Sequence, residues 1–238
     1  MEKYYEISIS NWRMKLLIVA ATRPEIEETI MWIKKYSSST NKNIKIKTLV
    51  TGIGMVATAY FLGKELSKQK YNLVINAGIA GAFSSNIGIG DTVIVSQDRF
   101  SELGAEDGNE FLSLNEINLQ NESEFPFQNG VIYNHYSLNL PSLNKLKQVK
   151  GITVNTIHGN QESIGHCINM FNPDIETMEG ASVFYVCKHE DTPCIQIRTI
   201  SNFIEKRNRN NWNIPLAVNN LNILITKLLQ ELNLQYAN

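Results

Sequence analysis

Apolar residues along this chain follow two spacings, which alternate from Met14 onward. Nearly continuous apolar runs, typical of strands buried on both faces, occupy residues 15–20 and 73–76, and a further strand is predicted at 193–200. Apolar residues at every third or fourth position predict helices, the longest of them at 215–232. Because strands that alternate with helices form parallel sheets, we expect an α/β fold. Its architecture would be a three-layer α/β/α sandwich with a mostly parallel central sheet.

The other elements follow from the same two patterns. Further strands are predicted at 44–50, 92–96, 131–134, 151–157 and 175–178. Further helices are predicted at 23–36 with Thr22 as N-cap, 55–70, 163–171 and 180–189, with a weaker helix after Pro141.

Glycines and polar residues mark the connections. Residues 51–54 form a tight turn, but its two glycines lack the third glycine and distal acid of a dinucleotide site. Residues 77–82 are small and predict a turn where a planar ligand could approach the backbone, although close packing of two elements would favour the same residues. Residues 101–108 read as an acidic loop. The polar segment 109–128 is unassigned and long enough for a lid or an oligomer contact.

Length and composition suit one domain. The chain has 238 residues, 43% of them hydrophobic, which is ample for a sizeable core. No linker composition interrupts it, so we expect a single domain over 14–238. Residues 1–13 carry neither a basic region nor an apolar run and are expected to be an extension of uncertain order, with Met14 as an alternative start.

The charge balance excludes several classes of protein. The 22 basic and 23 acidic side chains are mixed along the sequence, which is atypical of proteins that bind nucleic acid or membrane surfaces. No apolar run reaches the roughly 18 residues of a membrane span. The three cysteines lack metal-ligand spacing and predict reduced, mostly buried thiols in a cytoplasmic protein without a metal.

Three polar side chains follow predicted strands and are the candidates for chemistry. They are Glu25, Glu179 and Asn202. Each has a structural explanation as well: a capping box for Glu25, a favourable place near a helix N-terminus for Glu179, and a turn for Asn202. Because parallel strands present their carboxyl ends at one edge of a sheet, the three together indicate a ligand site there.

Five motifs carry a resemblance to a known family. MKLLIVAATRPE, TGIG, NAGIAGA, ETMEGA and RTISN occur in the order found in the purine nucleoside phosphorylase and nucleosidase superfamily. They are most similar to the methylthioadenosine/S-adenosylhomocysteine nucleosidases. Within that group, SELGAED and ISNFIEKRNRNNWNIPLAV resemble the futalosine hydrolases, which release hypoxanthine from futalosine in menaquinone biosynthesis.

The resemblance implies a role for each matching residue. Glu25 would activate the attacking water, and the pair Met178 and Glu179 would hold the ribose. Asn202, next to Ser201, stands where the nucleosidases have an aspartate that protonates the purine. The further contacts in the nucleoside pocket would come from Ile53, Ile79, Ala80 and Gly81. The reaction would need no cofactor. Relatives in which a second subunit closes the pocket imply a homodimer, with residues 101–107 or 109–128 at the contact.

The amide of Asn202 predicts which purine base is released. An amide can donate and accept hydrogen bonds but cannot supply an acidic proton, which suits a 6-oxopurine such as hypoxanthine. The strip 158–163 has no aromatic ring apart from His158, where adenine-specific relatives stack on the base. Polar base contacts could come from His158 or Gln161.

Three alternatives stay open at this stage. A phosphorylase would need converging arginines, and only Arg23 is expected near the site, which favours water as the nucleophile. An adenine-releasing nucleosidase and a non-catalytic nucleoside-binding protein are the other two.

The carboxylated tail of futalosine would need a cation, for which the candidates are Arg99, Arg207 and Arg209.

Overall fold

The computed structural model describes residues 14–37, 44–108 and 110–235. Its strands are β1 (Met14–Ala20), β2 (Ile44–Val50), β3 (Leu73–Ala82), β4 (Thr92–Asp98), β5 (Gly104–Asp107), β6 (Glu110–Ser113), β7 (Ile132–Tyr133), β8 (Lys147–Thr153), β9 (Ile175–Thr177) and β10 (Cys194–Phe203). Its helices are α1 (Arg23–Ser37), α2 (Met55–Leu66), α3 (Gln161–Phe171), α4 (Gly180–His189), the short 3-10 helix η1 (Arg209–Asn211) and α5 (Ile214–Gln235).

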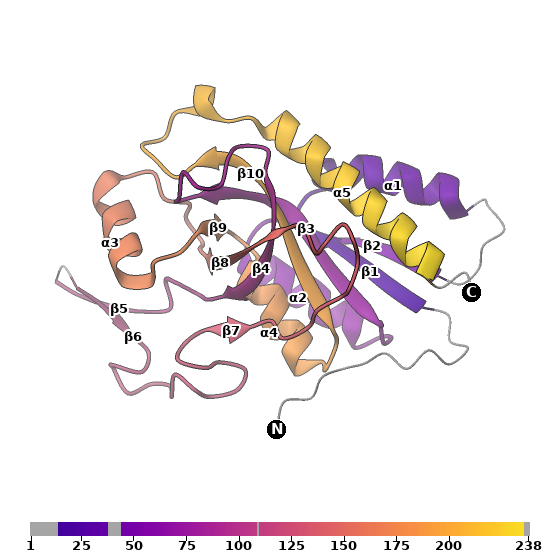
Figure 1. Cartoon of the computed structure of the whole chain (residues 1–238). Coiled ribbons are helices and arrows are strands. Elements are labelled where there is room, and N and C mark those ends of the chain that lie inside the picture. Colours follow the sequence, from indigo (N-terminus) through magenta and orange to yellow (C-terminus); the bar gives the residue numbers. More distant parts are fainter. Residues whose placement is uncertain (1–13, 38–43, 109, 236–238) are drawn as a thin grey trace.

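The central sheet closes on itself at one end. Strands β2, β1, β3 and β10 lie side by side and parallel. Strand β10 also pairs with β4, which pairs in turn with β8, β8 with β9, and β9 again with β3. The pairs β10–β4 and β3–β9 are antiparallel, and the others in this ring are parallel. Strands β1 and β2 extend the sheet outward from this ring at β3, and the short strand β7 pairs with β4 outside it (Figure 1).

Helices cover both faces of the sheet, as predicted. On β1, the side chains of Leu16 and Ile18 belong to one apolar cluster, which α1 and α5 cover. The alternate residues Leu17 and Val19 belong to a second cluster, which α2 and α4 cover (Figure 1). This two-sided burial explains the continuous apolar runs in the sequence, since each fully buried side chain of this size stabilises the fold by about 1.5–3 kcal/mol.

Several predicted boundaries are wrong. Residues 77–82 are not a turn but the second half of β3, where small side chains let the strand pass between its neighbours. Residues 104–107 and 110–113 pair as the β5–β6 hairpin instead of forming an acidic loop. Strand β8 begins four residues before its predicted start at residue 151. Helix α2 ends at Leu66 and not at residue 70, and turns follow Pro141 where a weaker helix was predicted.

The structure also bears on the expectations for the cysteines and for a membrane span. The three cysteines are free and buried, as predicted. No helix in the described part of the chain is long and apolar enough to cross a membrane. The expected extension over residues 1–13 lies outside the described residues.

Candidate active site

A cavity of about 400 Å³ opens at the carboxyl ends of the parallel strands. Its walls come from the junction of β1 with α1, the second half of β3, the junction of β9 with α4, and the end of β10. All nine residues predicted for the site line this cavity. They are Ile53, Ile79, Ala80, Gly81, Met178, Ser201, Glu25, Glu179 and Asn202.

Glu25 is held in place from two directions. Its Oε2 accepts hydrogen bonds of 2.8 Å from both the backbone N–H and the hydroxyl of Thr22. Its Oε1 accepts a 3.2 Å bond from the backbone N–H of Ile79 on β3. The predicted capping box is thus only half formed, because the Thr22 hydroxyl donates to Glu25 rather than capping the helix. The carboxylate bridges β1–α1 and β3 at the cavity wall.

Glu179 is buried at the start of α4, with 8% of its surface exposed. Its Oε1 accepts a 3.0 Å hydrogen bond from the backbone N–H of Gly54. Burial raises the pKa of Glu179 above the usual glutamate value, and the negative charge of Glu25 adds to the increase. The positive charge of Arg198 and the bond from Gly54 oppose it. Two carboxylates therefore act on each other electrostatically at one end of the cavity.

The N-terminus of α4 is fixed by hydroxyl groups beneath it. Thr177 Oγ1 accepts from the backbone N–H of Gly180 at 3.1 Å, and Thr153 Oγ1 accepts from that of Ala181 at 2.7 Å. Thr153 donates in turn to the buried carboxylate of Asp98 at 2.9 Å. These bonds satisfy donors that a helix start leaves unpaired and fix the position of the preceding Glu179.

Arg198 is a buried positive charge close to the site that the sequence reasoning missed, although it is not among the residues that line the cavity. It lies on β10, is 1% exposed, and contributes positive charge near both Glu179 and Asp98. Within the described residues its Nε and Nη2 atoms have no hydrogen-bond acceptor. A Cβ added to Gly78 would lie 2.0 Å from Arg198 Nη1 and 3.1 Å from Glu25 Oε1, so the guanidinium lies against the glycine. A charged residue inside an apolar strand run was the available signal.

Arg23, by contrast, is not the basic residue of the site. Its side chain is 61% exposed and pairs with Glu27 on the surface of α1. The expectation that Arg23 alone would bring positive charge near the site is therefore wrong.

Asn202 owes its direction to an irregularity in β10. The register with β3 passes from Ile200 opposite Ala80 to Asn202 opposite Gly81, so Ser201 is an inserted bulge residue. The Ser201 hydroxyl lies 2.8 Å from Asn202 Oδ1, to which it can donate, and 3.2 Å from the backbone oxygen of Ala80. The Asn202 amide nitrogen donates to the backbone oxygen of Phe203 at 3.0 Å. Asn202 therefore lies within a strand and not in the turn that the sequence suggested.

A second missed feature is the buried pair of Glu176 and His158. The Glu176 side chain is 0% exposed; it accepts a 3.0 Å bond from the His158 backbone N–H and contacts His158 Nδ1. This contact raises the pKa of His158, and burial opposes the increase. Both residues line the cavity.

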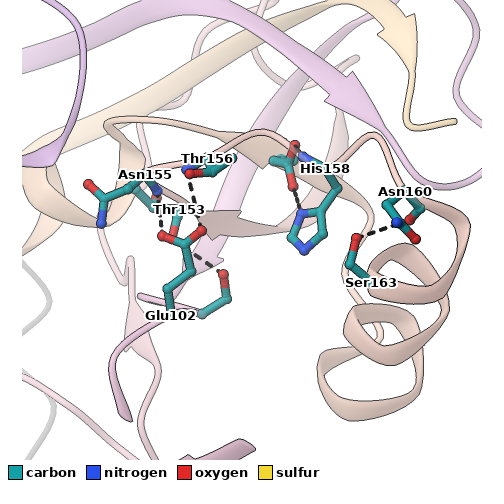
Figure 2. A network of polar contacts seen from close by, with 9 residues as sticks. Glu102, Thr153, Asn155, Thr156, His158, Asn160 and Ser163 are labelled. Carbon is teal, nitrogen blue, oxygen red and sulfur yellow. Dashed lines mark hydrogen bonds and ion pairs between the residues drawn. The ribbon is translucent and has the colours of Figure 1, made fainter. Parts of the chain in front are cut away.

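Figure 2 shows the surroundings of His158. Glu102 accepts bonds from the backbone N–H groups of Asn155 and Thr156, at 2.6 and 3.3 Å, and so fixes the segment that leads to His158. Glu102 and His158 both line a neighbouring cavity beside α3, whereas Glu102 does not line the first one.

Of the three arginines proposed to bind the substrate tail, one lines the candidate site. Arg207 lines the cavity and lies over the ring of Trp212, another lining residue, at 5.3 Å. Arg99 lies over Phe171 and lines a different cavity. Neither Arg209 nor Gln161 is among the residues that line the candidate site.

Comparison with known proteins places the chain in a family. The model of the phosphorylase superfamily matches residues 35–230. The chain is 26% identical to the 5′-methylthioadenosine/S-adenosylhomocysteine nucleosidase of Shewanella pealeana over 79% of this chain and 86% of the relative. It is 28% identical to the futalosine hydrolase of Acidothermus cellulolyticus over 73% of this chain and 70% of the relative.

Solved structures of both kinds share the fold. The futalosine hydrolase of Helicobacter pylori superposes with a TM-score of 0.74 at 18% identity and covers 92% of this chain and 98% of its own. The nucleosidase of Colwellia psychrerythraea, solved with adenine, gives a TM-score of 0.73 at 21% identity, with 92% and 96% covered. The resemblance and fold expected from the motifs are confirmed. The chain belongs to the phosphorylase superfamily, among its nucleosidases.

Proposed function

We propose that this protein hydrolyses the N-glycosidic bond of futalosine and releases hypoxanthine. The observation that carries the proposal is the arrangement of one cavity: Glu25 and Glu179 lie together at its wall, and Asn202 also lines it where an ionisable acid was the family expectation. Relatives named futalosine hydrolase support the substrate, while relatives named methylthioadenosine/S-adenosylhomocysteine nucleosidase define the nearest alternative.

The two carboxylates suit the sugar. Breaking a nucleoside bond builds positive charge on the ribose, which nearby carboxylates stabilise. Glu179 would accept hydrogen bonds from the ribose hydroxyls. Glu25 would take a proton from a water molecule whose oxygen bonds to the anomeric carbon. The electron pair of the broken bond leaves with the base, which takes up a proton from solvent, and Glu25 returns the proton of the attacking water to solvent.

The amide suits the base. Asn202 would donate a hydrogen bond to N7 or O6 of a 6-oxopurine, and the Ser201 hydroxyl holds its oxygen so that the NH₂ group is turned away from Ser201. An adenine presents an amino group where hypoxanthine presents O6. A half-buried amide fixed in one orientation would leave one of these patterns unpaired, which is the physical basis of selection.

The tail of futalosine carries a carboxylate, and Arg207 is the proposed partner because it lines the cavity. We further propose a homodimer. Val56 and Tyr60 on the outer face of α2 are 81% and 59% exposed, and Ile53 at the cavity is 62% exposed. A second copy covering this apolar face would also close the cavity, beside the contact expected from 101–107 or from 109–128. A cytoplasmic location stays a prediction.

The buried guanidinium favours one second candidate. Arg198 does not line the cavity, but in the described structure it has donors without acceptors, and arginine donors of this kind bind phosphate in phosphorylases. A purine nucleoside phosphorylase is therefore the alternative function.

One assay separates these functions. The protein is incubated with futalosine, inosine and methylthioadenosine, with and without phosphate, and the released bases are identified by chromatography. Hypoxanthine from futalosine without phosphate is the expected result, and Glu25→Gln should lower this rate by roughly 10²–10⁴-fold. Adenine from methylthioadenosine would support the other nucleosidase, and release that requires phosphate would support the phosphorylase. Binding without turnover of any substrate would indicate a non-catalytic protein.

A further inference from the structure

Asn222 is a polar residue on α5, a helix that lies alongside α1 (Figure 1), and it is 2% exposed. Its Oδ1 accepts hydrogen bonds from the backbone N–H and the hydroxyl of Thr29 on α1, at 2.9 and 2.7 Å. Its Nδ2 donates to the backbone oxygens of Glu25 and Val218, at 2.9 and 2.7 Å. An asparagine amide has two acceptor and two donor positions, so these bonds use its whole capacity.

The bonds to α1 fall where that helix is irregular. Ile26 has a φ of −127° and a ψ of 17°, which are not helical values, so a kink separates the first turn of α1 from the rest. In a regular helix, the backbone oxygen of Glu25 would accept from the backbone N–H of Thr29. Both of these groups bond to Asn222. The amide therefore bridges the two groups that one helical hydrogen bond would join, and side chains inserted in this way kink helices.

The turn before the kink carries Glu25. Its carboxylate accepts from the hydroxyl of Thr22 at 2.8 Å and from the backbone N–H of Ile79 on β3 at 3.2 Å. Because the dihedral angles of Ile26 set the direction of the turn that precedes it, helical values there would move Glu25 relative to β3. Glu25 is therefore held at both ends, and its backbone is held by an amide that does not line the cavity.

A tether between α1 and α5 is the structural explanation for such an amide, but a tether needs no particular place along α1. Asn233 forms a tether of this kind, since its Oδ1 accepts from the hydroxyl of Tyr36 in the last turn of α1. Asn222 differs because it bonds at the kink, to the residue that carries the proposed general base.

Resting on the proposed function, in which Glu25 activates water, we propose that Asn222 is a positioning residue for Glu25. Its amide keeps the first turn of α1 out of line with the rest of the helix and so holds the Glu25 carboxylate against β3. Asn222 does not line the cavity, so its effect on the reaction passes through Glu25. A displaced general base lowers the rate steeply, because proton transfer from water requires hydrogen-bond distance.

Asn222→Leu removes the bridge, since leucine has the same branching as asparagine but no polar atoms. The backbone oxygen of Glu25 and the N–H of Thr29 can then pair with each other as in a regular helix, which draws the carboxylate away from β3. We expect kcat to fall by at least about tenfold, while the KM for the nucleoside changes by less than about threefold. A smaller fall in kcat, or a change confined to KM, would overturn the proposal.

A double-mutant cycle with Glu25→Gln shows whether the effect passes through Glu25. Once the carboxylate is absent, adding Asn222→Leu should change kcat by less than about twofold, because the effects of residues that act as a unit are not additive. A further fall of about tenfold in the double variant would show that Asn222 acts independently of Glu25, and the proposal would be wrong. Asn222→Ala takes the same place in the cycle if Asn222→Leu does not fold.

Asn233→Ala is the matched control, because it removes a hydrogen bond between the same two helices away from the kink. Its kcat should stay within about twofold of the wild-type value, since the first turn of α1 keeps its bridge. A loss of kcat equal to that of Asn222→Leu would mean that any contact between α1 and α5 serves, which contradicts a specific role for Asn222.

A crystal structure of Asn222→Leu keeps the inference separate from the proposed function, because it needs no turnover. We expect helical dihedral angles at Ile26 and a Glu25 carboxylate that no longer reaches the N–H of Ile79. An unchanged kink with the carboxylate in place overturns the inference, whichever substrate the protein cleaves. Adenine released from methylthioadenosine, in place of hypoxanthine from futalosine, overturns the proposed substrate alone, and the cycle is then measured with methylthioadenosine.

Discussion

Glu179 and Gly54 are 125 positions apart in the sequence, yet the Gly54 backbone N–H donates a 3.0 Å hydrogen bond to the Glu179 carboxylate. Gly54 has a φ of 94°, in the region that glycine adopts without strain, and it precedes the first residue of α2. Glu179 directly precedes α4. The contact therefore joins the starts of two helices that pack on the same face of the sheet, and it orients the carboxylate at the cavity.

Glu179→Gln should lower kcat/KM by at least about 100-fold, because an amide removes the negative charge that stabilises the developing cation. Burial raises the pKa of Glu179, so the carboxylate becomes protonated at a higher pH than an exposed glutamate does. The acid limb of the wild-type pH profile should then lie above the ordinary value of about 4.3. Two results would contradict the role of Glu179 as a charged group: wild-type activity that does not fall as the pH is lowered to about 4.3, or near-complete activity in Glu179→Gln.

Gly78→Ala should disable the site through Arg198. The added Cβ would lie 2.0 Å from the guanidinium nitrogen Nη1, and a fully buried arginine has little room to shift. We expect a loss of about 1–3 kcal/mol in the free energy of unfolding and at least a tenfold loss of kcat/KM. Gly63→Ala in α2 is the control, since its Cβ would lie 4.0 Å from Val186. The free energy of unfolding of the Gly63→Ala variant should rise by about 0.5–1 kcal/mol, and its kcat/KM should stay at the wild-type value. Equal activity in both variants would exclude a role for the Arg198 position.

Asn202→Asp should shift the released base. An aspartic acid can protonate N7 and no longer offers an amide donor, so cleavage of futalosine should fall relative to cleavage of its 6-amino analogue by at least about tenfold. Competition between the two substrates, with both bases quantified, measures the ratio directly. An unchanged ratio would leave base selection to other residues.

Asp98→Asn should stabilise the protein at neutral pH. Burial raises the pKa of Asp98 to about 6, despite hydrogen bonds from Gln196, Thr153 and the Arg99 backbone. Because the folded state holds the proton more tightly than the unfolded state, wild-type stability falls as the pH rises from about 4 to 6 and stays lower above that.

Asparagine has no such titration. Measured by urea unfolding, the advantage of Asp98→Asn over the wild type should therefore grow by up to about 3 kcal/mol between pH 4 and pH 7. In the described part of the chain, Gln196 Oε1 is a buried acceptor without a donor, which the new amide could supply. A stability difference that does not vary with pH would contradict the assigned cause.

The sequence alone predicted the layers of the fold and nine of the residues that line the cavity. The layers and the three polar candidates depend on local signals, whereas the other six residues came from the resemblance of the motifs to a known family. Apolar runs buried on two faces give the strands and amphipathic patterns give the helices, while parallel strands bring the residues at their carboxyl ends to one edge. Glu25 and Glu179 come just after β1 and β9, and Asn202 lies near the carboxyl end of β10, so their convergence could be predicted from order along the chain.

Only the tertiary structure decided the rest. The ring closure through β9, the bulge at Ser201, the guanidinium of Arg198 against Gly78 and the pair of Glu176 with His158 each join segments that are distant in sequence or alter a register. The reason is that a buried charge has no periodic signature of its own. Its role depends on which groups the packing places around it, and that is fixed only when the sheet closes and the strands take their register.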